Sequence, residues 1–322
     1  MTLGLQNAGL RVVCGVDIDP VAAKTYRTNL KTPVLEGDIG ALKPGRLKSL
    51  LPKGSRLILA VCAPCQPFSK VRKSGRRRKD RDLLAAVGRL VEELKPAGVI
   101  VENVPQIGNG RKGSVLQAFC QALKDAGYSF AYRTVDAKDF GVPQRRRRLV
   151  LLGIKGIDEV IELPSPNGYE RKTVRDAIAG LPPVGAGEVA PRRPMHRAAR
   201  LSTKNLKRLK ATPHNGGDSR TWPKGLKLPC HVRSGGFYDV YGRMRWDAPA
   251  PTLTTRCNSL SNGRFGHPVQ NRALTLLEAA ILQTFPRSYH FEGNQNDIAR
   301  QIGNAVPPKL AEALARSLLK HL

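Results

Sequence analysis

Apolar and polar positions along the first half of the chain follow two patterns. Short runs of branched apolar residues predict strands, and longer stretches with apolar residues three or four positions apart predict amphipathic helices. The predicted strands are residues 10–16, 57–61, 99–101, 128–135 and 149–154. The predicted helices are residues 20–30, 83–94 and 115–126. Strands that alternate with helices favour an α/β fold with a mostly parallel sheet covered on both faces.

The pattern changes in the second half of the chain. Between residues 156 and 271, Pro, Gly and Arg become frequent and regular spacing fades, which predicts a smaller, loop-rich domain with short strands. Helical spacing returns over residues 274–282 and 305–319. We therefore expect one domain built from residues 1–155 and 272–322, and a second built from residues 156–271.

Charge narrows the range of partners. The 322-residue chain has 54 Lys and Arg against 25 Asp and Glu, a net charge of +29. This excess favours a polyanionic partner, most often nucleic acid, with a membrane surface or a generally basic proteome as the alternative. No stretch contains the roughly 18 apolar residues of a membrane span, and the first residues do not resemble a signal peptide.

The six Cys residues are scattered, which favours a reducing, cytoplasmic location over a disulfide scaffold. Cys62 and Cys65 form a C-x-x-C pattern, so a thiol-redox site is an alternative, and oxidation that joins the two thiols is a further hypothesis. No second Cys pair completes a zinc site, and the dispersed His residues predict no metal site.

Residues with catalytic potential follow the ends of predicted strands. Asp17, Cys65 and Glu102 lie at or just after such ends, and ligands of parallel α/β sheets bind at this edge. A Cys thiolate is a strong nucleophile, and a carboxyl with a raised pKa can donate to a ring nitrogen. Alternate arginines between Gln144 and Arg148 are expected to face the sheet edge, where they can hold an oxygen. These groups suit the addition of a nucleophile to an electron-poor ring.

In order and spacing, four blocks of the sequence resemble the cytosine-C5 DNA methyltransferases. The blocks are Pro64-Cys65-Gln66, Glu102-Asn103-Val104, Gln144 to Arg148, and Gln301 to Val306. Weaker matches extend over the whole chain except residues 156 to about 245. The resemblance implies a doubly wound, Rossmann-like fold that binds S-adenosylmethionine, with a loop-rich target-recognition domain. It also implies methyl transfer to carbon 5 of a cytosine that is flipped out of duplex DNA.

The resemblance implies a role for each matching residue. Cys65 adds to carbon 6 of the ring, Glu102 supports ring nitrogen N3, and Arg146 and Arg148 hold the base carbonyl and a phosphate. The implied cofactor-binding residues are Asp17, Ile18, Asp38, Ile39, Pro64, Asn304 and Val306. The implied DNA-binding residues are Gln66, Ser69, Arg72, Lys73, Arg76, Arg81, Gln144, Thr252 and Leu253. Further candidates for contacts with bases or phosphates are Arg233, Tyr238, Arg243 and Arg245.

Two departures from the family pattern keep alternatives open. Residues 1–5 match the helix that follows a Phe-x-Gly-x-Gly-Gly cofactor loop in the family, so either the start is assigned late or the chain is short and binds its cofactor less well. Cys62 and Ala63 stand where the family often has Gly and a bulky residue. The alternatives are a tRNA cytosine-5 methyltransferase and a catalytically impaired DNA-binding form. We otherwise expect a monomeric, nucleoid-associated enzyme, with or without a cognate restriction endonuclease.

Overall fold

The computed structural model describes residues 1–62, 81–108, 115–228 and 238–322. They form two compact units. Unit 1 consists of residues 1–137, 147–168 and 308–322, and unit 2 of residues 138–146 and 169–307. Residues 272–307, which we expect in the first domain from the sequence, pack within unit 2. The assignment of functions to the two domains stays a prediction.

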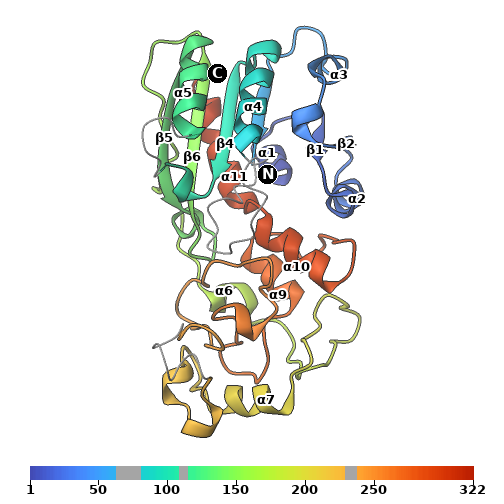
Figure 1. Ribbon diagram of the computed structural model, residues 1–322, viewed down its shortest axis with the longest axis vertical. Helices are drawn as coiled ribbons and strands as arrows, with labels where there is room; N and C mark the ends of the chain where they lie inside the picture. The colour runs from blue at the N-terminus through green and yellow to red at the C-terminus, as the bar shows by residue number, and fades with distance from the viewer. Residues whose placement is uncertain (63–80, 109–114, 229–237) are drawn as a thin grey trace. The chain divides into compact units, whose positions relative to one another are not determined.

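The strands of the described residues belong to unit 1 and form two sheets (Figure 1). They are β1 (Gly15–Asp17), β2 (Val34–Glu36), β3 (Ile58–Val61), β4 (Gly98–Asn103), β5 (Tyr128–Asp136) and β6 (Arg147–Lys155). One sheet is the parallel pair of β1 and β2. The other has the order β3-β4-β6-β5, in which β3 and β4 are parallel and β6 is antiparallel to both of its neighbours. No α-helix separates β5 from β6, so the chain returns beside β5 in the opposite direction.

Helices cover both faces of the four-stranded sheet, as an α/β fold requires. Unit 1 contains α1 (Thr2–Asn7), α2 (Pro20–Asn29), α3 (Pro44–Lys48), α4 (Arg81–Leu94), α5 (Val115–Asp125) and α11 (Pro308–Leu319). Apolar side chains of α4 and α5, such as Val87 and Phe119, share a core with Val99 and Leu151 of the sheet. On the other face α11 packs against β4 and β6 (Figure 1).

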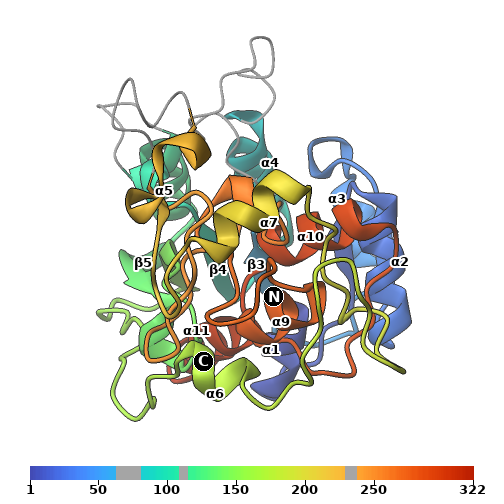
Figure 2. The same cartoon turned by 90° about the horizontal axis from the view of Figure 1, so that it is seen from below.

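The ends of these helices follow from local chemistry. Pro20 opens α2, whose N-cap Asp19 accepts a hydrogen bond from Val21. After α4, Lys95 adopts a positive φ of 46° directly before Pro96, which prevents the helix from continuing. Helix α1 lies against α11 (Figure 2), and this contact requires Gly4, because a Cβ there would collide with the backbone of Pro308.

Unit 2 is built from short helices and loops. It contains α6 (Val174–Ile178), α7 (Thr203–Lys210), α9 (Leu276–Leu282) and α10 (Gln295–Asn304), with 3-10 turns between them. The expected short strands are represented in its described residues by isolated bridges. Its core includes Leu253, Phe265, Leu282 and Ile302. The predicted final helix begins at Pro308 rather than at residue 305, and α10 was not predicted.

Two kinds of feature were sought among the described residues. None of their helices is long and apolar enough to cross a membrane. They also contain no group of three or more His, Cys, Asp and Glu residues that could hold a metal ion.

Candidate active site

Part of the predicted site lies outside the described residues. These positions are Pro64, Cys65, Gln66, Ser69, Arg72, Lys73, Arg76 and Arg233, together with the side chain of Arg81. The approach to the predicted nucleophile is described as far as Cys62, which directly follows β3. Its neighbour Val61 pairs with Val101 of β4, and Val101 precedes Glu102. The carboxyl end of β3, which Cys65 follows in the sequence, therefore lies at the same end of the sheet as Glu102.

Glu102 forms the best-defined polar feature of this edge. It sits near the carboxyl end of β4 with 6% of its surface exposed. Its Oε1 lies 2.9 Å from Arg148 Nε, and both side chains are largely buried. The pairing of the strands explains this contact, because Glu102 is opposite Val150 and Arg148 is two residues away on the same face of β6. Oε1 receives no well-oriented hydrogen bond from the described residues, so the pair is an ionic contact.

The arginine run alternates between exposed and less exposed side chains, but of the two expected at the sheet edge Arg148 alone contacts Glu102 among the described residues. Arg145 and Arg147 are exposed, whereas Arg146 and Arg148 are not. Arg146, in unit 2, donates to the carbonyls of Leu253 (3.2 Å), Gly303 (3.0 Å) and Ala305 (3.0 Å). These are backbone contacts within unit 2, so Arg148 is the arginine that accompanies Glu102. The predicted contact of Arg146 with the base stays a prediction.

Several predicted nucleic-acid contacts are instead packed inside unit 2. Gln144 is fully buried; its amide donates to Gln283 (2.7 Å) and accepts from the backbone of Leu253 (2.9 Å). Leu253 is buried in the core, whereas Thr252 is exposed and donates to the Arg145 carbonyl. This arrangement leaves Thr252 as the member of the group that is open to solvent. The role of Gln283 as the partner of Gln144 was not foreseen, because the two residues are far apart in the sequence.

Arg243 is a structural residue rather than an exposed reader of DNA. It is completely buried, and burial lowers the pKa of its guanidinium to about 10. Its nitrogens donate to the carbonyls of Leu209, Thr212 and His267, among other acceptors. These bonds fasten loops of unit 2 to one another, and the sequence offered no signal for them. Arg245, by contrast, is exposed.

The predicted cofactor residues of unit 1 lie together at the ends of β1 and β2. Asp17 ends β1, and its carbonyl accepts a hydrogen bond from Gly37, which follows β2 (3.0 Å). Asp38 comes next and accepts from the backbone of Gly40 (2.8 Å). Burial raises the pKa of Asp17, and the backbone N–H of Asp19 opposes this effect with a hydrogen bond of 2.9 Å. A carboxylate that follows each of two paired parallel strands suits the hydroxyl and amino groups of a nucleoside.

The other cofactor candidates fall into two groups. Ile18 is 68% exposed beside Asp17, and Ile39 packs at the border of the unit 1 core. The contacts of both isoleucines with the cofactor stay predictions. Asn304 and Val306 belong to unit 2, where Asn304 is exposed at the end of α10 and Val306 is buried. Gly303, which directly precedes Asn304, is required, because a Cβ there would collide with the backbone of Thr254.

Cys62 has the properties of an inert thiol. The residue retains exposed surface at the end of β3, whereas burial of its thiol raises the thiol pKa to about 12, with Glu102 and Asp17 adding to the effect. The electrostatic influence of both carboxylates indicates that the ends of β1, β3 and β4 face one region. A thiol with this pKa is poorly suited to the thiol-redox alternative.

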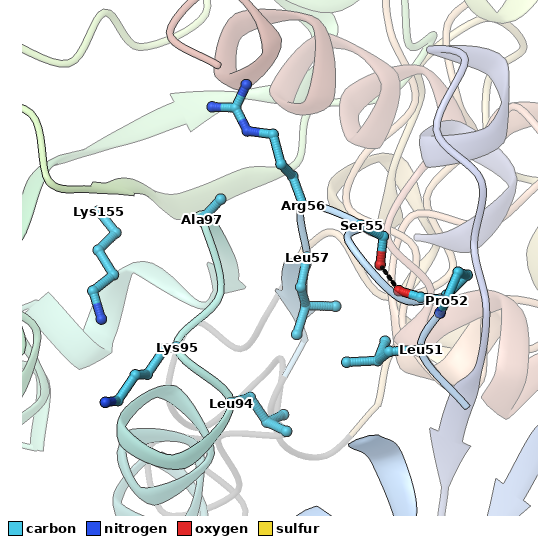
Figure 3. Close-up of a pocket in the computed structure, with 9 residues that line it drawn as sticks. All are labelled: Leu51, Pro52, Ser55, Arg56, Leu57, Leu94, Lys95, Ala97 and Lys155. Carbon is cyan, nitrogen blue, oxygen red and sulfur yellow. Dashed lines mark hydrogen bonds between the residues drawn. The ribbon is translucent and has the colours of Figure 1, made fainter. Parts of the chain in front are cut away.

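A depression of about 430 Å³ in unit 1 lies at the opposite edge of the sheet (Figure 3). Its lining includes Leu57 and Ala97, which precede β3 and β4, and Lys155 at the end of the antiparallel β6. The charged side chains around it are Arg56, Lys95 and Lys155. Ligands of α/β sheets bind at the carboxyl ends of parallel strands, and a nucleoside needs acceptors for its hydroxyls. The residues that line the depression include no carboxylate and precede the parallel strands, so it is distinct from the candidate site.

Comparison with known proteins agrees with the geometry. The family model for C-5 cytosine-specific DNA methylases matches residues 1–320. Type II methylase M.HgiDII of Herpetosiphon aurantiacus is 40% identical over all of this chain and 92% of its own length. Type II methyltransferase M1.HphI of Haemophilus parahaemolyticus is 33% identical, over 99% of this chain and 83% of its own.

Solved structures support the fold. A putative DNA modification methyltransferase from an E. coli prophage aligns with a TM-score of 0.78 at 23% identity, covering 99% of this chain and 95% of its own. The S. pombe Dnmt2 methyltransferase aligns with a TM-score of 0.68 at 17% identity, covering 100% and 95%. The α/β, Rossmann-like methyltransferase fold is thus confirmed. The chain belongs to the C-5 cytosine-specific DNA methylase family and is a DNA cytosine-5 methyltransferase that uses S-adenosylmethionine.

Proposed function

We propose that the chain methylates carbon 5 of cytosine in duplex DNA through a covalent adduct between Cys65 and carbon 6. The observation that carries this mechanism is the buried Glu102, held by Arg148 at the sheet edge toward which the chain leaves β3 for Cys65. Direct methylation of carbon 5 is slow because this carbon is a weak nucleophile. Addition of the Cys65 thiolate to carbon 6 turns the ring into an enamine whose carbon 5 is nucleophilic.

Glu102 supports this addition at ring nitrogen N3. A carboxyl that donates to N3, or shares a proton with it, relieves the negative charge that enters the ring with the thiolate. Arg148 holds the carboxyl in position and leaves other N–H groups of its guanidinium for the base carbonyl. S-adenosylmethionine, when bound beside Asp17 and Asp38, supplies the methyl group. Loss of the carbon 5 proton then expels the Cys65 thiolate and restores the aromatic ring.

The first test measures transfer of labelled methyl from S-adenosylmethionine to mixed-sequence duplex DNA. The chain should label DNA, whereas Cys65→Ser should not. The adduct is tested with duplexes that contain 5-fluorocytosine, because fluorine cannot leave as a proton and the adduct cannot break down. A denaturant-resistant protein–DNA complex should form with Cys65 and not with the serine variant. Label that persists in Cys65→Ser would contradict the proposed nucleophile.

A competition assay separates duplex DNA from tRNA as the substrate. With both present in equal amounts, we expect the label in the duplex. Preferential labelling of tRNA would overturn the duplex assignment while leaving the chemistry of the base intact. We further infer that the chain acts as a monomer beside a restriction endonuclease of the same specificity, as the Type II relatives suggest. Sedimentation at a mass other than the 35.2 kDa of one chain would contradict the monomer.

A further inference from the structure

Arginines of unit 2 differ in how far they are buried. Arg146, Arg243 and Arg272 are buried and bind backbone carbonyls or Glu278, so they stabilise the fold. Arg220, in the 3-10 turn Ser219–Thr221, differs because 68% of its side chain is exposed. An exposed arginine is usually mobile, yet the guanidinium of Arg220 is fixed.

The guanidinium is fixed by a buried acid and an aromatic ring. Arg220 Nε donates to Asp218 Oδ1 (2.9 Å) and Nη2 donates to Oδ2 (2.7 Å), while the Tyr238 ring lies 5.6 Å from its Cζ. Only 5% of the Asp218 side chain is exposed, and Arg264 also donates to it (3.3 Å). The bond from Arg220 lowers the pKa of Asp218 to about 2, so the carboxylate stays charged at neutral pH. The direction of the guanidinium is therefore set before any ligand arrives.

The geometry leaves one edge of Arg220 available. A guanidinium has five N–H groups, and the side that carries Nε is occupied by Asp218. The remaining edge carries two parallel N–H groups, one on Nη1 and one on Nη2. Among the described residues, Asp218 is the acceptor that the guanidinium binds, and it does so through the side that carries Nε. Two parallel donors match O6 and N7 of guanine, the commonest specific contact of arginine in the major groove.

We propose that Arg220 reads a guanine in the recognition sequence, with Asp218 and Tyr238 as positioning residues. This inference rests on the proposed action on duplex DNA. Attraction to a phosphate requires charge but little direction, and the exposed lysines of α7 supply such charge. A buried carboxylate that fixes the guanidinium adds direction, which matters for a base edge. The contact would therefore determine specificity more than affinity.

Arg175 provides a matched control. Its guanidinium lies 5.5 Å from the Trp246 ring and donates to an acid through Nε and Nη2, as that of Arg220 does. Both of these bonds reach the same oxygen of Asp247, whose side chain is 70% exposed. An exposed carboxylate does not fix the guanidinium, so we expect Arg175 to contribute no base discrimination.

The test is methylation of a duplex library with randomised bases around the target cytosine, read by sequencing the methylated molecules. Wild type, Arg220→Lys and Arg175→Lys are compared, since both substitutions keep the charge and remove the fork of donors. In Arg220→Lys, discrimination at one guanine position should fall by about 5- to 150-fold, with the other positions unchanged. Arg175→Lys should retain the wild-type profile.

Three results would overturn the assignment of Arg220. They are an unchanged profile in Arg220→Lys, the same change in Arg175→Lys, and an equal loss over all sequences with a weaker salt dependence, which indicates a phosphate contact. Arg220→Lys also weakens the partnership of the buried Asp218, so the profiles are compared at a temperature at which circular dichroism shows both variants to be folded, and misfolding is thereby recognised separately. A wild-type protein that methylates no sequence would overturn the proposed function itself.

Discussion

Glu102 and Arg148 show how one buried contact defines an active-site candidate. The carboxyl is enclosed by the sheet on which it sits, and its described charged partner is on the adjacent strand. Such a group is positioned by the fold instead of by the substrate. Its contribution should therefore be seen in the rate of reaction more than in the binding of DNA.

We predict that Glu102→Gln lowers kcat by about 10²- to 10⁴-fold, the usual contribution of a general acid or base. Glutamine keeps the size of the side chain but cannot share a proton with ring nitrogen N3. The measurement is single-turnover methyl transfer at saturating DNA, with DNA affinity measured in parallel. Glu93→Gln, on the exposed side of α4, is the control and should behave as wild type. A loss confined to DNA affinity would contradict the role.

Cys62 gives a second prediction at this scale. Because the pKa of its thiol is raised to about 12, the thiolate is scarce at pH 8. Iodoacetamide should therefore modify Cys62 tens of times more slowly than free cysteine, and the rate should keep rising beyond pH 10. Mass spectrometry of the Cys62 peptide over a pH series measures this. Rapid modification at pH 8 would revive the thiol-redox alternative.

At the scale of elements, a buried ion pair secures the start of α9. Arg272 donates to both carboxylate oxygens of Glu278 (2.7 Å each), and Glu278 also accepts from the backbone of Thr275, the N-cap of α9. Burial alone would raise the pKa of Glu278, but the hydrogen bonds and charge of Arg272 lower it overall. The pair links the loop before α9 to its first turn, so the helix and the loop should unfold together.

We predict that Glu278→Gln lowers the free energy of unfolding by about 3–5 kcal/mol, because it leaves the Arg272 charge buried without its partner. Denaturant titration measures the change. Glu312→Gln removes the partially exposed pair with Arg316 on α11 and should cost under about 1 kcal/mol. Equal effects of the two substitutions would contradict the prediction.

The lowered pKa of Glu278 also predicts the direction of a pH effect. The stabilisation is complete above the pKa of an unfolded Glu, about 4.3, and is lost as the pH falls through the lower pKa of the folded state. Wild type should thus lose stability below about pH 4 more steeply than Glu278→Gln. Parallel acid-unfolding curves for the two proteins would argue against this contribution.

The accuracy of prediction differed between elements for physical reasons. Helix α5 was predicted almost to the residue, because its apolar face is continuous and Gly127, with a φ of +79°, follows it. Helix α10 was missed because its first turn is polar, although the capping pair Asn294 and Asp297 was visible in the sequence. The first predicted strand shrank to Gly15–Asp17, because β2 offers only a short partner.

The predicted site was limited by what spacing can reveal. Glu102 and Asp17 follow strands, so their common edge could be predicted from the order of elements. The burial of Gln144 could not, because its partners Gln283 and Leu253 are more than 100 residues away. A motif residue held in the core and a motif residue open to DNA look alike in a sequence.

For the whole molecule, we expect the net charge to determine the affinity for any duplex, whereas methylation depends on the DNA sequence. The net charge of +29 predicts that affinity for any duplex falls steeply with salt, by about 10³-fold or more between 50 and 200 mM if six or more phosphates are contacted. Fluorescence anisotropy with a cognate and an unrelated duplex measures both slopes. We expect similar slopes but methylation of the cognate duplex alone. An affinity that is insensitive to salt would contradict this role of the charge.

The contacts of Arg146 have a consequence for exchanging parts between relatives. Arg146 is separated along the chain from residues 169–307, yet its guanidinium binds carbonyls of Leu253, Gly303 and Ala305 within that segment. If residues 169–307 alone were grafted, their carbonyls would face the arginine loop of a different protein. The buried hydrogen bonds between the loop and the carbonyls would then fit less well. A chimera meant to acquire a new target sequence should therefore carry residues 138–146 from the same donor. The transferable module is discontinuous, and its smaller piece ends one residue before β6, the strand that carries Arg148.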